Sequence, residues 1–268
     1  MDPLLLGTSA GLERNCTVLF SHLTALCGTK PAGEPHNPLQ VHLRVDDGHR
    51  DTALQHIKVL YDVAVRHNPR TSVTVVPLAP LEYYETPNRN TNSREGHKLP
   101  LFTASLMTPN CGFNPVYKGV AVGGTFDRLH GGHKLLLTTA LLHATQVLRI
   151  GVTVSTMLTT KIHADLIEPF EVRCAAVTKF AHLLRPDLGL EVAGIADRAG
   201  GADSDPSLEA LVVSPETVGA LPSINTARLS VGLKPLECVL VPYVGVCDDE
   251  ESRVSSTNIR KRLCELST

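Results

Sequence analysis

The chain has 268 residues, of which 43% are apolar and 19% charged, as in an ordinary globular protein of one or two domains. Its formal net charge is −2 and it has no long run of lysine or arginine, which argues against nonspecific nucleic-acid binding because such binding neutralises many phosphates. Its seven cysteines form no CxxC pair, which disfavours a disulfide framework or a zinc site and fits a reducing compartment.

The first 115 residues show α/β patterning and contain no motif that carries chemistry. Short apolar and β-branched runs predict strands at 17–20 and 72–76, while apolar residues near helical spacing predict a helix over 51–67. Residues 80–115 are rich in proline and asparagine, which indicates an irregular linker. We therefore predict a smaller α/β N-terminal domain over residues 1–115, with the linker at its end.

Apolar runs and helical stretches alternate over residues 116–268, where we predict a second domain. The predicted elements are strand 120–123, helix 135–144, strand 147–154, helix 170–184, and strands 190–195, 211–214 and 238–243. Such alternation is typical of a Rossmann-like, doubly wound parallel sheet. Ligands bind such sheets at the carboxyl ends of the strands, so the turn after the first strand is the expected site.

The most informative stretch follows that first strand and reads Gly-Gly-Thr-Phe-Asp-Arg-Leu-His-Gly-Gly-His from Gly123 to His133. Small residues, Gly123 and Gly124 among them, let the backbone approach a ligand, and the N–H groups that open the next helix face an anion. His130 and His133 are three residues apart, so both project toward the same end of the sheet. Two exposed polar histidines, or a zinc site, are the alternatives, and no metal ligand is assigned.

A second candidate phosphate contact reads Val-Ser-Ser-Thr-Asn-Ile-Arg and runs from Val254 to Arg260. Ser255, Ser256 and Thr257 are suited to cap the start of a final helix, and capping by itself is a sufficient explanation for them. A capped helix start also presents hydroxyls and backbone donors to an anion, and Arg260 adds a guanidinium for bidentate phosphate contact. We therefore predict that this segment binds a triphosphate.

The segment from His130 to His133 resembles the HxGH signature of the nucleotidyltransferase superfamily, and the Ser-Ser-Thr-Asn-Ile-Arg segment resembles its second signature. Residues 204–217 are similar to the eukaryotic and archaeal phosphopantetheine adenylyltransferases, including the adenylyltransferase domain of the bifunctional coenzyme A synthases. This resemblance implies adenylyl transfer from ATP to 4′-phosphopantetheine, with Mg²⁺ accompanying ATP. A cytidylyltransferase, a nicotinamide-mononucleotide adenylyltransferase and a catalytically weakened scaffold are the alternatives.

The resemblance also implies roles for single residues. His133 is expected to stabilise charge on the α-phosphate and His130 to hold neighbouring phosphate oxygens. The expected catalytic residues are His133, Lys161 and Thr125. The expected contacts to the substrate phosphate are Thr125, Lys161 and Arg228. Relatives often carry an aspartate where this chain has Val154 and an arginine where it has Thr226, so two polar contacts are missing.

Two further residues near the first signature have expected roles. Asp127 is predicted to brace the turn through hydrogen bonds to backbone, as short carboxylates commonly do. Arg173, on the predicted helix 170–184, matches an arginine that is frequent in the family. An outer-face charge explains Arg173 equally well, so it is not included in the catalytic set.

The resemblance and the hydropathy of the chain bear on partners and location. The sequence contains no Gly-x-x-x-x-Gly-Lys-Ser/Thr motif, so we expect no kinase activity in this polypeptide, and a dephospho-CoA kinase on a separate chain is left open as a partner. No apolar run reaches membrane-spanning length, and the start does not read as a secretory signal. We expect a cytoplasmic protein, with association with the mitochondrial surface left open.

Overall fold

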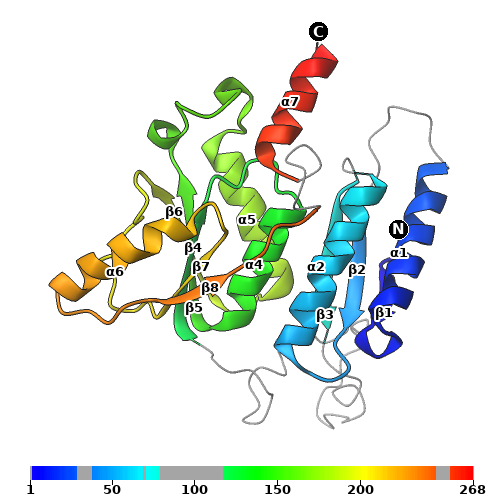
Figure 1. Cartoon of the computed structure of the whole chain (residues 1–268), viewed down its shortest axis with the longest axis horizontal. Helices are drawn as coiled ribbons and strands as arrows, with labels where there is room; N and C mark the ends of the chain where they lie inside the picture. Colours follow the sequence, from blue (N-terminus) through cyan, green and yellow to red (C-terminus); the bar gives the residue numbers. More distant parts are fainter. Residues whose placement is uncertain (1, 29–37, 69–70, 79–116, 246–253, 268) are drawn as a thin grey trace, which may run out of the picture. The chain divides into compact units, whose positions relative to one another are not determined.

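The computed structural model describes residues 2–28, 38–68, 71–78, 117–245 and 254–267 (Figure 1). The chain divides into two compact units, Met1–Asn114 and Pro115–Thr268, and each is described by itself. The predicted linker over residues 80–115 lies outside the described residues. Within the described ranges, no helix is both long enough and apolar enough to cross a membrane.

The N-terminal unit contains a three-stranded parallel sheet with the strand order β1-β2-β3. Its elements are β1 (Leu4–Gly7), α1 (Leu12–Gly28), β2 (Leu39–Arg44), α2 (Arg50–His67) and β3 (Val73–Leu78). The predicted helix over 51–67 and strand over 72–76 are confirmed by α2 and β3. Buried apolar side chains alternate along β2, so one face of this strand enters the core.

The predicted strand over residues 17–20 is wrong, because these residues lie inside α1. The buried residues of α1 are Asn15, Leu19 and Leu23, which recur every four positions and form one helical face. A run of four apolar residues does not by itself distinguish a strand from a buried helix segment. The helical spacing of the flanking leucines is therefore the deciding signal at this place.

The second unit is a five-stranded parallel sheet with the order β6-β5-β4-β7-β8. Its strands are β4 (Tyr117–Gly124), β5 (Ala144–Thr153), β6 (Gly189–Ile195), β7 (Ala210–Val213) and β8 (Glu237–Leu240). Its helices are α4 (Gly131–His143), α5 (Phe170–Leu184), α6 (Leu221–Ser230) and α7 (Ser256–Ser267). The first strand of the unit is central and the chain fills one side of it before the other, which confirms the predicted doubly wound sheet.

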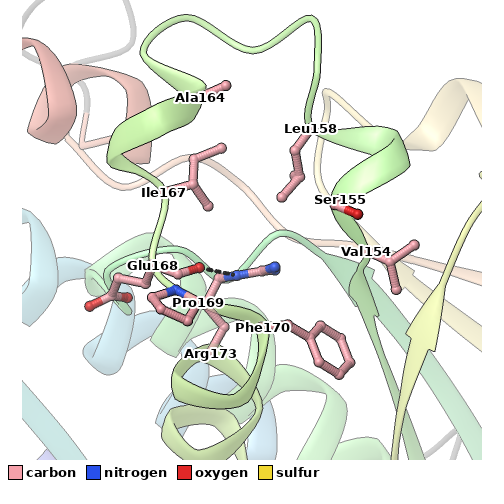
Figure 2. Close-up of a pocket in the computed structure, with 9 residues that line it drawn as sticks. All are labelled: Val154, Ser155, Leu158, Ala164, Ile167, Glu168, Pro169, Phe170 and Arg173. Atoms are coloured by element: carbon pink, nitrogen blue, oxygen red, sulfur yellow. Dashed lines mark hydrogen bonds between the residues drawn. The ribbon is translucent and has the colours of Figure 1, made fainter.

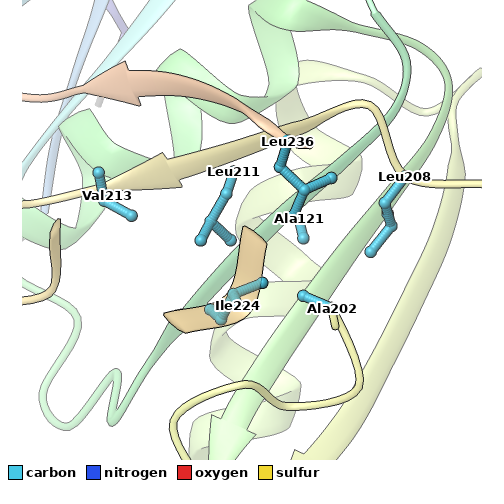
Figure 3. Close-up of a cluster of buried hydrophobic side chains, with 7 residues drawn as sticks. All are labelled: Ala121, Ala202, Leu208, Leu211, Val213, Ile224 and Leu236. Carbon is cyan, nitrogen blue, oxygen red and sulfur yellow. The ribbon is translucent and has the colours of Figure 1, made fainter. Parts of the chain in front are cut away.

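The helices of this unit cover both faces of the sheet. Figure 3 shows one face, where Ala121 of β4 and Leu211 of β7 pack near Ile224 of α6. The remaining buried members of this cluster are Ala202, Leu208, Val213 and Leu236. Because successive side chains of a strand alternate, Val120 and Val122 point to the opposite face and are buried there. Close packing extends to the backbone, since a side chain at Gly119 would collide with the carbonyl oxygen of Ser207.

Candidate active site

The turn between β4 and α4 has an unusual backbone that other segments hold in place. Phe126 and Arg128 adopt φ angles of 52° and 50°, a left-handed conformation that side chains other than glycine rarely adopt. The Arg128 N–H donates to Glu168 Oε2 at 2.7 Å, and the Glu168 N–H donates to Asp127 Oδ1 at 3.0 Å. Asp127 therefore braces the turn as predicted, although its backbone partner comes from the loop before α5.

The two histidines of the first signature stack on each other at the start of α4. Their ring centroids are 3.9 Å apart and the ring planes differ by 23°. His130 is the N-cap residue, and its Nδ1 accepts a hydrogen bond from the Gly132 N–H at 3.2 Å. A neutral His130 thus carries its proton on Nε2. The Nδ1 atom of His133 is buried and has no hydrogen-bond partner in the described part of the chain.

Both imidazoles are uncharged at neutral pH. Burial lowers the pKa of His133 to about 4; the carboxylate of Asp127 opposes this shift and the charge of Lys161 adds to it. Burial also holds the pKa of His130 well below its usual range; the charge of Lys134, and that of His133 once it is protonated in acid, lower it further. The pair can therefore donate hydrogen bonds to an anion without first carrying charge.

This shift predicts acid sensitivity. The pKa of His133 falls from 6.5 to about 4 on folding, so between these pH values the unfolded chain binds a proton that the folded chain does not. We expect the free energy of unfolding to decrease as the pH falls through this window, and His133→Gln to make the decrease shallower. Urea unfolding at a series of pH values measures both slopes, and identical slopes for the two proteins would contradict the prediction.

Thr125 and Lys161, the other two predicted catalytic residues, lie at the edge of the sheet where the histidines are found. The Thr153 hydroxyl donates to Thr125 Oγ1 at 3.3 Å, where β4 and β5 end side by side. Lys161 is exposed on the loop between β5 and α5, and it lies close enough to lower the pKa of His133. Thr125 thus lies at the carboxyl edge of the sheet that the histidines border, and Lys161 lies close enough to His133 to influence its charge state.

The second signature packs against the first. Ser255 Oγ accepts a backbone N–H of α7 at 3.2 Å, which is the predicted capping contact. The Ser256 hydroxyl donates to the Asp127 carbonyl oxygen at 2.8 Å. A side chain at Gly132 would lie 3.9 Å from the Val254 carbonyl oxygen, so the starts of α4 and α7 are close neighbours.

The position of Arg260 departs from the predicted triphosphate contact. Its side chain is 1% exposed, and its Nη1 donates to Asp127 Oδ2 at 2.6 Å. Its Nε donates to the Ile162 carbonyl oxygen at 3.1 Å, and its Nη2 donates to Thr257 Oγ1 at 3.3 Å. Every guanidinium nitrogen thus has a partner within the protein, which leaves no bidentate face open to a phosphate.

The position of Arg228 also departs from its predicted role, which was to contact the substrate phosphate. Arg228 is 2% exposed, and its guanidinium bonds to backbone carbonyl oxygens of the described chain. It donates at 2.7–3.0 Å to the carbonyl oxygens of Lys234, Ala202, Asp205 and Leu208. Ala202, Asp205 and Leu208 precede β7, at the amino end of the strands, whereas the histidines lie at the carboxyl end. The structure therefore places Arg228 outside the candidate site, where it secures the chain before β7.

The glycines of the turn make room for protein side chains. A side chain at Gly123 would approach Ile195 at 3.5 Å, and one at Gly124 would approach the Phe126 ring at 3.2 Å. A side chain at Gly123 would thus make an ordinary contact and one at Gly124 a tight contact, so protein side chains lie beside both glycines. A side chain at Gly132 would approach the His130 ring at 3.2 Å, so Gly132 is tightly packed beside the histidines.

Arg173 has a more central position than predicted. Its side chain is buried, and its Nη1 donates to the carbonyl oxygens of Thr125 at 2.7 Å and Thr153 at 3.0 Å. Its Nε donates to the Glu168 carbonyl oxygen at 2.9 Å, the bond drawn in Figure 2. One guanidinium thus joins the ends of β4 and β5 to the loop before α5. The sequence signal was its place one turn into the helix 170–184, at the carboxyl edge of the sheet.

A pocket of about 280 Å³ opens beside Arg173, between the loop after β5 and the start of α5 (Figure 2). Its lining is mainly apolar and consists of Val154, Ser155, Leu158, Ala164, Ile167, Glu168, Pro169, Phe170 and Arg173. Val154 makes its wall of the pocket apolar. The pocket borders the turn because Arg173 also contacts Thr125.

Comparison with known proteins agrees with this geometry. The model of the cytidylyltransferase-like family matches residues 121–262, just over half of the chain. A phosphopantetheine adenylyltransferase of Methanopyrus kandleri is 37% identical over 159 residues, which cover 59% of this chain and 96% of the relative. The chain belongs to the phosphopantetheine adenylyltransferase family.

Other members of the phosphopantetheine adenylyltransferase family show the same extent of similarity. The Thermococcus kodakarensis relative is 39% identical over 153 residues, covering 56% of this chain and 88% of the relative. The Saccharomyces cerevisiae relative is 39% identical over 145 residues, covering 53% of this chain and 48% of the relative. The chain therefore spans about half the length of the yeast protein. The family model matches only the second unit.

Proposed function

We propose that this chain transfers the adenylyl group of ATP to 4′-phosphopantetheine, giving dephospho-CoA and pyrophosphate. The observation that carries the proposal is the pair of stacked, uncharged histidines at the start of α4, beside the start of α7. Two helix starts and two imidazole donors converge on one place, which suits a polyphosphate. The names of the yeast and archaeal relatives support the two substrates.

The reaction joins two phosphates. An oxygen of the 4′-phosphopantetheine phosphate attacks the α-phosphorus of ATP, and the bond from this phosphorus to the oxygen that bridges to the β-phosphate breaks. The nucleophile is already ionised, so the site works by positioning and by stabilising charge, and needs no strong base. Pyrophosphate leaves with the electron pair of the broken bond.

Each residue of the turn has a role in this proposal. His133 donates to the α-phosphate as charge develops there, and His130 donates through Nε2 to a neighbouring phosphate oxygen. Thr125 and Lys161 hold the attacking phosphate, the threonine by its hydroxyl and the lysine by its charge. The place of Thr125 at the end of β4, beside Thr153, and the nearness of Lys161 to His133 support these roles.

The start of α7 completes the triphosphate site, with the hydroxyls of Ser255 and Thr257 and the first backbone N–H groups facing the anion. Ser256, whose hydroxyl donates to the Asp127 carbonyl oxygen, contributes through its backbone N–H. The described residues contain no group of three or more histidine, cysteine, aspartate or glutamate side chains that could hold a metal ion. In this proposal Mg²⁺ is held mainly by phosphate oxygens and water. Bound in that way, Mg²⁺ neutralises part of the triphosphate charge.

The proposal is tested by pyrophosphate release from the purified chain with ATP, Mg²⁺ and 4′-phosphopantetheine, with dephospho-CoA identified by mass. Parallel reactions replace the acceptor by nicotinamide mononucleotide, or the pair by CTP and phosphocholine. We expect turnover only with ATP and 4′-phosphopantetheine. Turnover with another pair would replace the substrate, and no turnover with any pair would favour a scaffold role.

The proposed product, dephospho-CoA, is consumed by a further enzyme. Dephospho-CoA is the substrate of a dephospho-CoA kinase, and we propose that a kinase of this kind acts next, in the cytoplasm. Cell fractionation followed by purification of the chain tests both points. Recovery of the chain mainly in another compartment, with no separate chain that carries kinase activity, would contradict them.

A further inference from the structure

Asp127 and Arg260 form a buried ion pair between the two signatures. Their side chains are 0% and 1% exposed, and Arg260 Nη1 lies 2.6 Å from Asp127 Oδ2. The carbonyl oxygen of Asp127 also accepts the Ser256 hydroxyl at 2.8 Å. Asp127 thus contacts α7 through both its side chain and its backbone, while its other carboxylate oxygen accepts the Glu168 N–H at 3.0 Å.

Burial makes this pair depend on the docking of α7. A charge removed from water is costly unless a partner and hydrogen bonds compensate it. With α7 in place, Asp127 has the guanidinium and the Glu168 N–H. Removing α7 would leave the carboxylate without its counterion. The charge of Asp127 and the docked position of α7 therefore stabilise each other.

The remaining contacts of Arg260 also fix the start of α7 to its neighbours. Its Nε bonds to the Ile162 carbonyl oxygen, next to Lys161, and its Nη2 bonds to Thr257 Oγ1 in the first turn of its own helix. The guanidinium therefore joins the turn of β4, the loop that carries Lys161 and the start of α7. The Arg260 side chain that makes these contacts is itself enclosed.

We infer that Asp127 and Arg260 are a positioning pair, which holds Ser255, Ser256 and Thr257 against the histidine turn, and that Arg260 acts on the triphosphate only through this placement. The inference rests on the proposed function for its choice of ligand. A direct phosphate ligand would behave differently: its effect on ATP binding would not depend on Asp127, and neutralising Asp127 would leave the cation free for the phosphate.

The test begins with amide hydrogen exchange of the full chain without nucleotide. Asp127→Asn keeps an oxygen that can accept the Glu168 N–H but removes the charge. We expect the amides of α7 to exchange about tenfold faster or more in this variant, because a coupling above about 1.4 kcal/mol is a tenfold change in an equilibrium. Lys261→Met, which removes an exposed cation from the same helix, is the matched control and should not change the exchange. Unchanged exchange in Asp127→Asn would overturn the inference.

The second measurement is the Kd of ATP by calorimetry, for Asp127→Asn, Arg260→Met and the double variant. We expect each single change to raise the Kd about tenfold or more, and the double variant to bind no more weakly than the weaker single variant, because partners in one pair are not additive. Tighter or unchanged binding in Asp127→Asn, with the same loss from Arg260→Met in either background, would show a direct ligand and overturn the inference.

Two further results distinguish a failure of this inference from a failure of the proposed function. Arg260→Lys keeps the positive charge but loses the several directed hydrogen bonds of the guanidinium. If the pair positions α7, this variant should have a Kd for ATP between those of the unaltered chain and Arg260→Met. If the single variants fail to fold, this conservative variant carries the test through exchange in α7. Faster exchange together with absent adenylyl transfer in the unaltered chain would refute the proposed function and leave the positioning pair standing.

Discussion

His133→Ala is expected to lower the turnover number for pyrophosphate release by about 10²–10³-fold, the usual cost of removing one preorganised donor to developing charge. The imidazole is uncharged at neutral pH and stacked on His130, and its buried Nδ1 lacks a partner in the described part of the chain. In the proposed reaction this neutral ring donates a hydrogen bond to the reacting phosphate. The affinity for ATP should change much less, because the helix starts and His130 remain.

The measurement is kcat and KM for both substrates, with the Kd of ATP from calorimetry. His182→Ala is the matched control, since His182 is exposed on α5 and should leave all three constants unchanged. A loss of ATP affinity with unchanged turnover would assign His133 to ground-state binding and contradict the prediction.

Arg173→Met is expected to lower both the stability of the second unit and the turnover number. The change leaves three carbonyl oxygens, those of Thr125, Thr153 and Glu168, without their donor. Each buried acceptor that loses its partner costs about 1–3 kcal/mol, so a loss of about 3 kcal/mol or more in the free energy of unfolding is expected. Turnover should fall because Thr125 is no longer fixed at the end of β4.

Urea unfolding followed by circular dichroism measures the first effect and pyrophosphate release the second. Lys179→Met removes an exposed cation from the same helix and is the control, with no expected change. Arg173→Lys should recover part of the stability, because an ammonium keeps the charge but cannot reproduce the fork of the guanidinium. An Arg173→Met protein as stable as the control would refute the structural role.

The sheet of the second unit and its glycine-bearing turn are predictable from sequence because their signals are local. Buried parallel strands give continuous apolar runs, and α5 has the bounds that its helical spacing predicts. By contrast, α6 was not predicted, and β8 ends at Leu240, earlier than its apolar run indicates. Short elements at the border of a sheet depend on tertiary contacts that sequence periodicity does not record.

The three arginines show where prediction of the site fails. Arg173, Arg228 and Arg260 are each at most 2% exposed and bond mainly to atoms of the protein. A sequence motif gives the type of side chain, and an arginine near a phosphate-binding pattern suggests a phosphate contact. Whether the guanidinium faces the ligand or holds backbone carbonyls depends on which segments surround it, and these segments are far apart in sequence. The histidines were predictable because the glycines beside them fix their place locally.

The contact between Asp127 and Arg260 spans 133 positions of the chain, which bears on the order in which the unit folds. Local pairing of β4, α4 and β5 requires the closure of short loops only, whereas this contact closes a long one at a greater entropic cost. Docking of α7 should therefore be a late step, and during synthesis the residues that complete the anion site leave the ribosome after all the strands. A nascent chain with a finished sheet would still lack nucleotide binding, so affinity for ATP would report completion of folding more faithfully than secondary structure does.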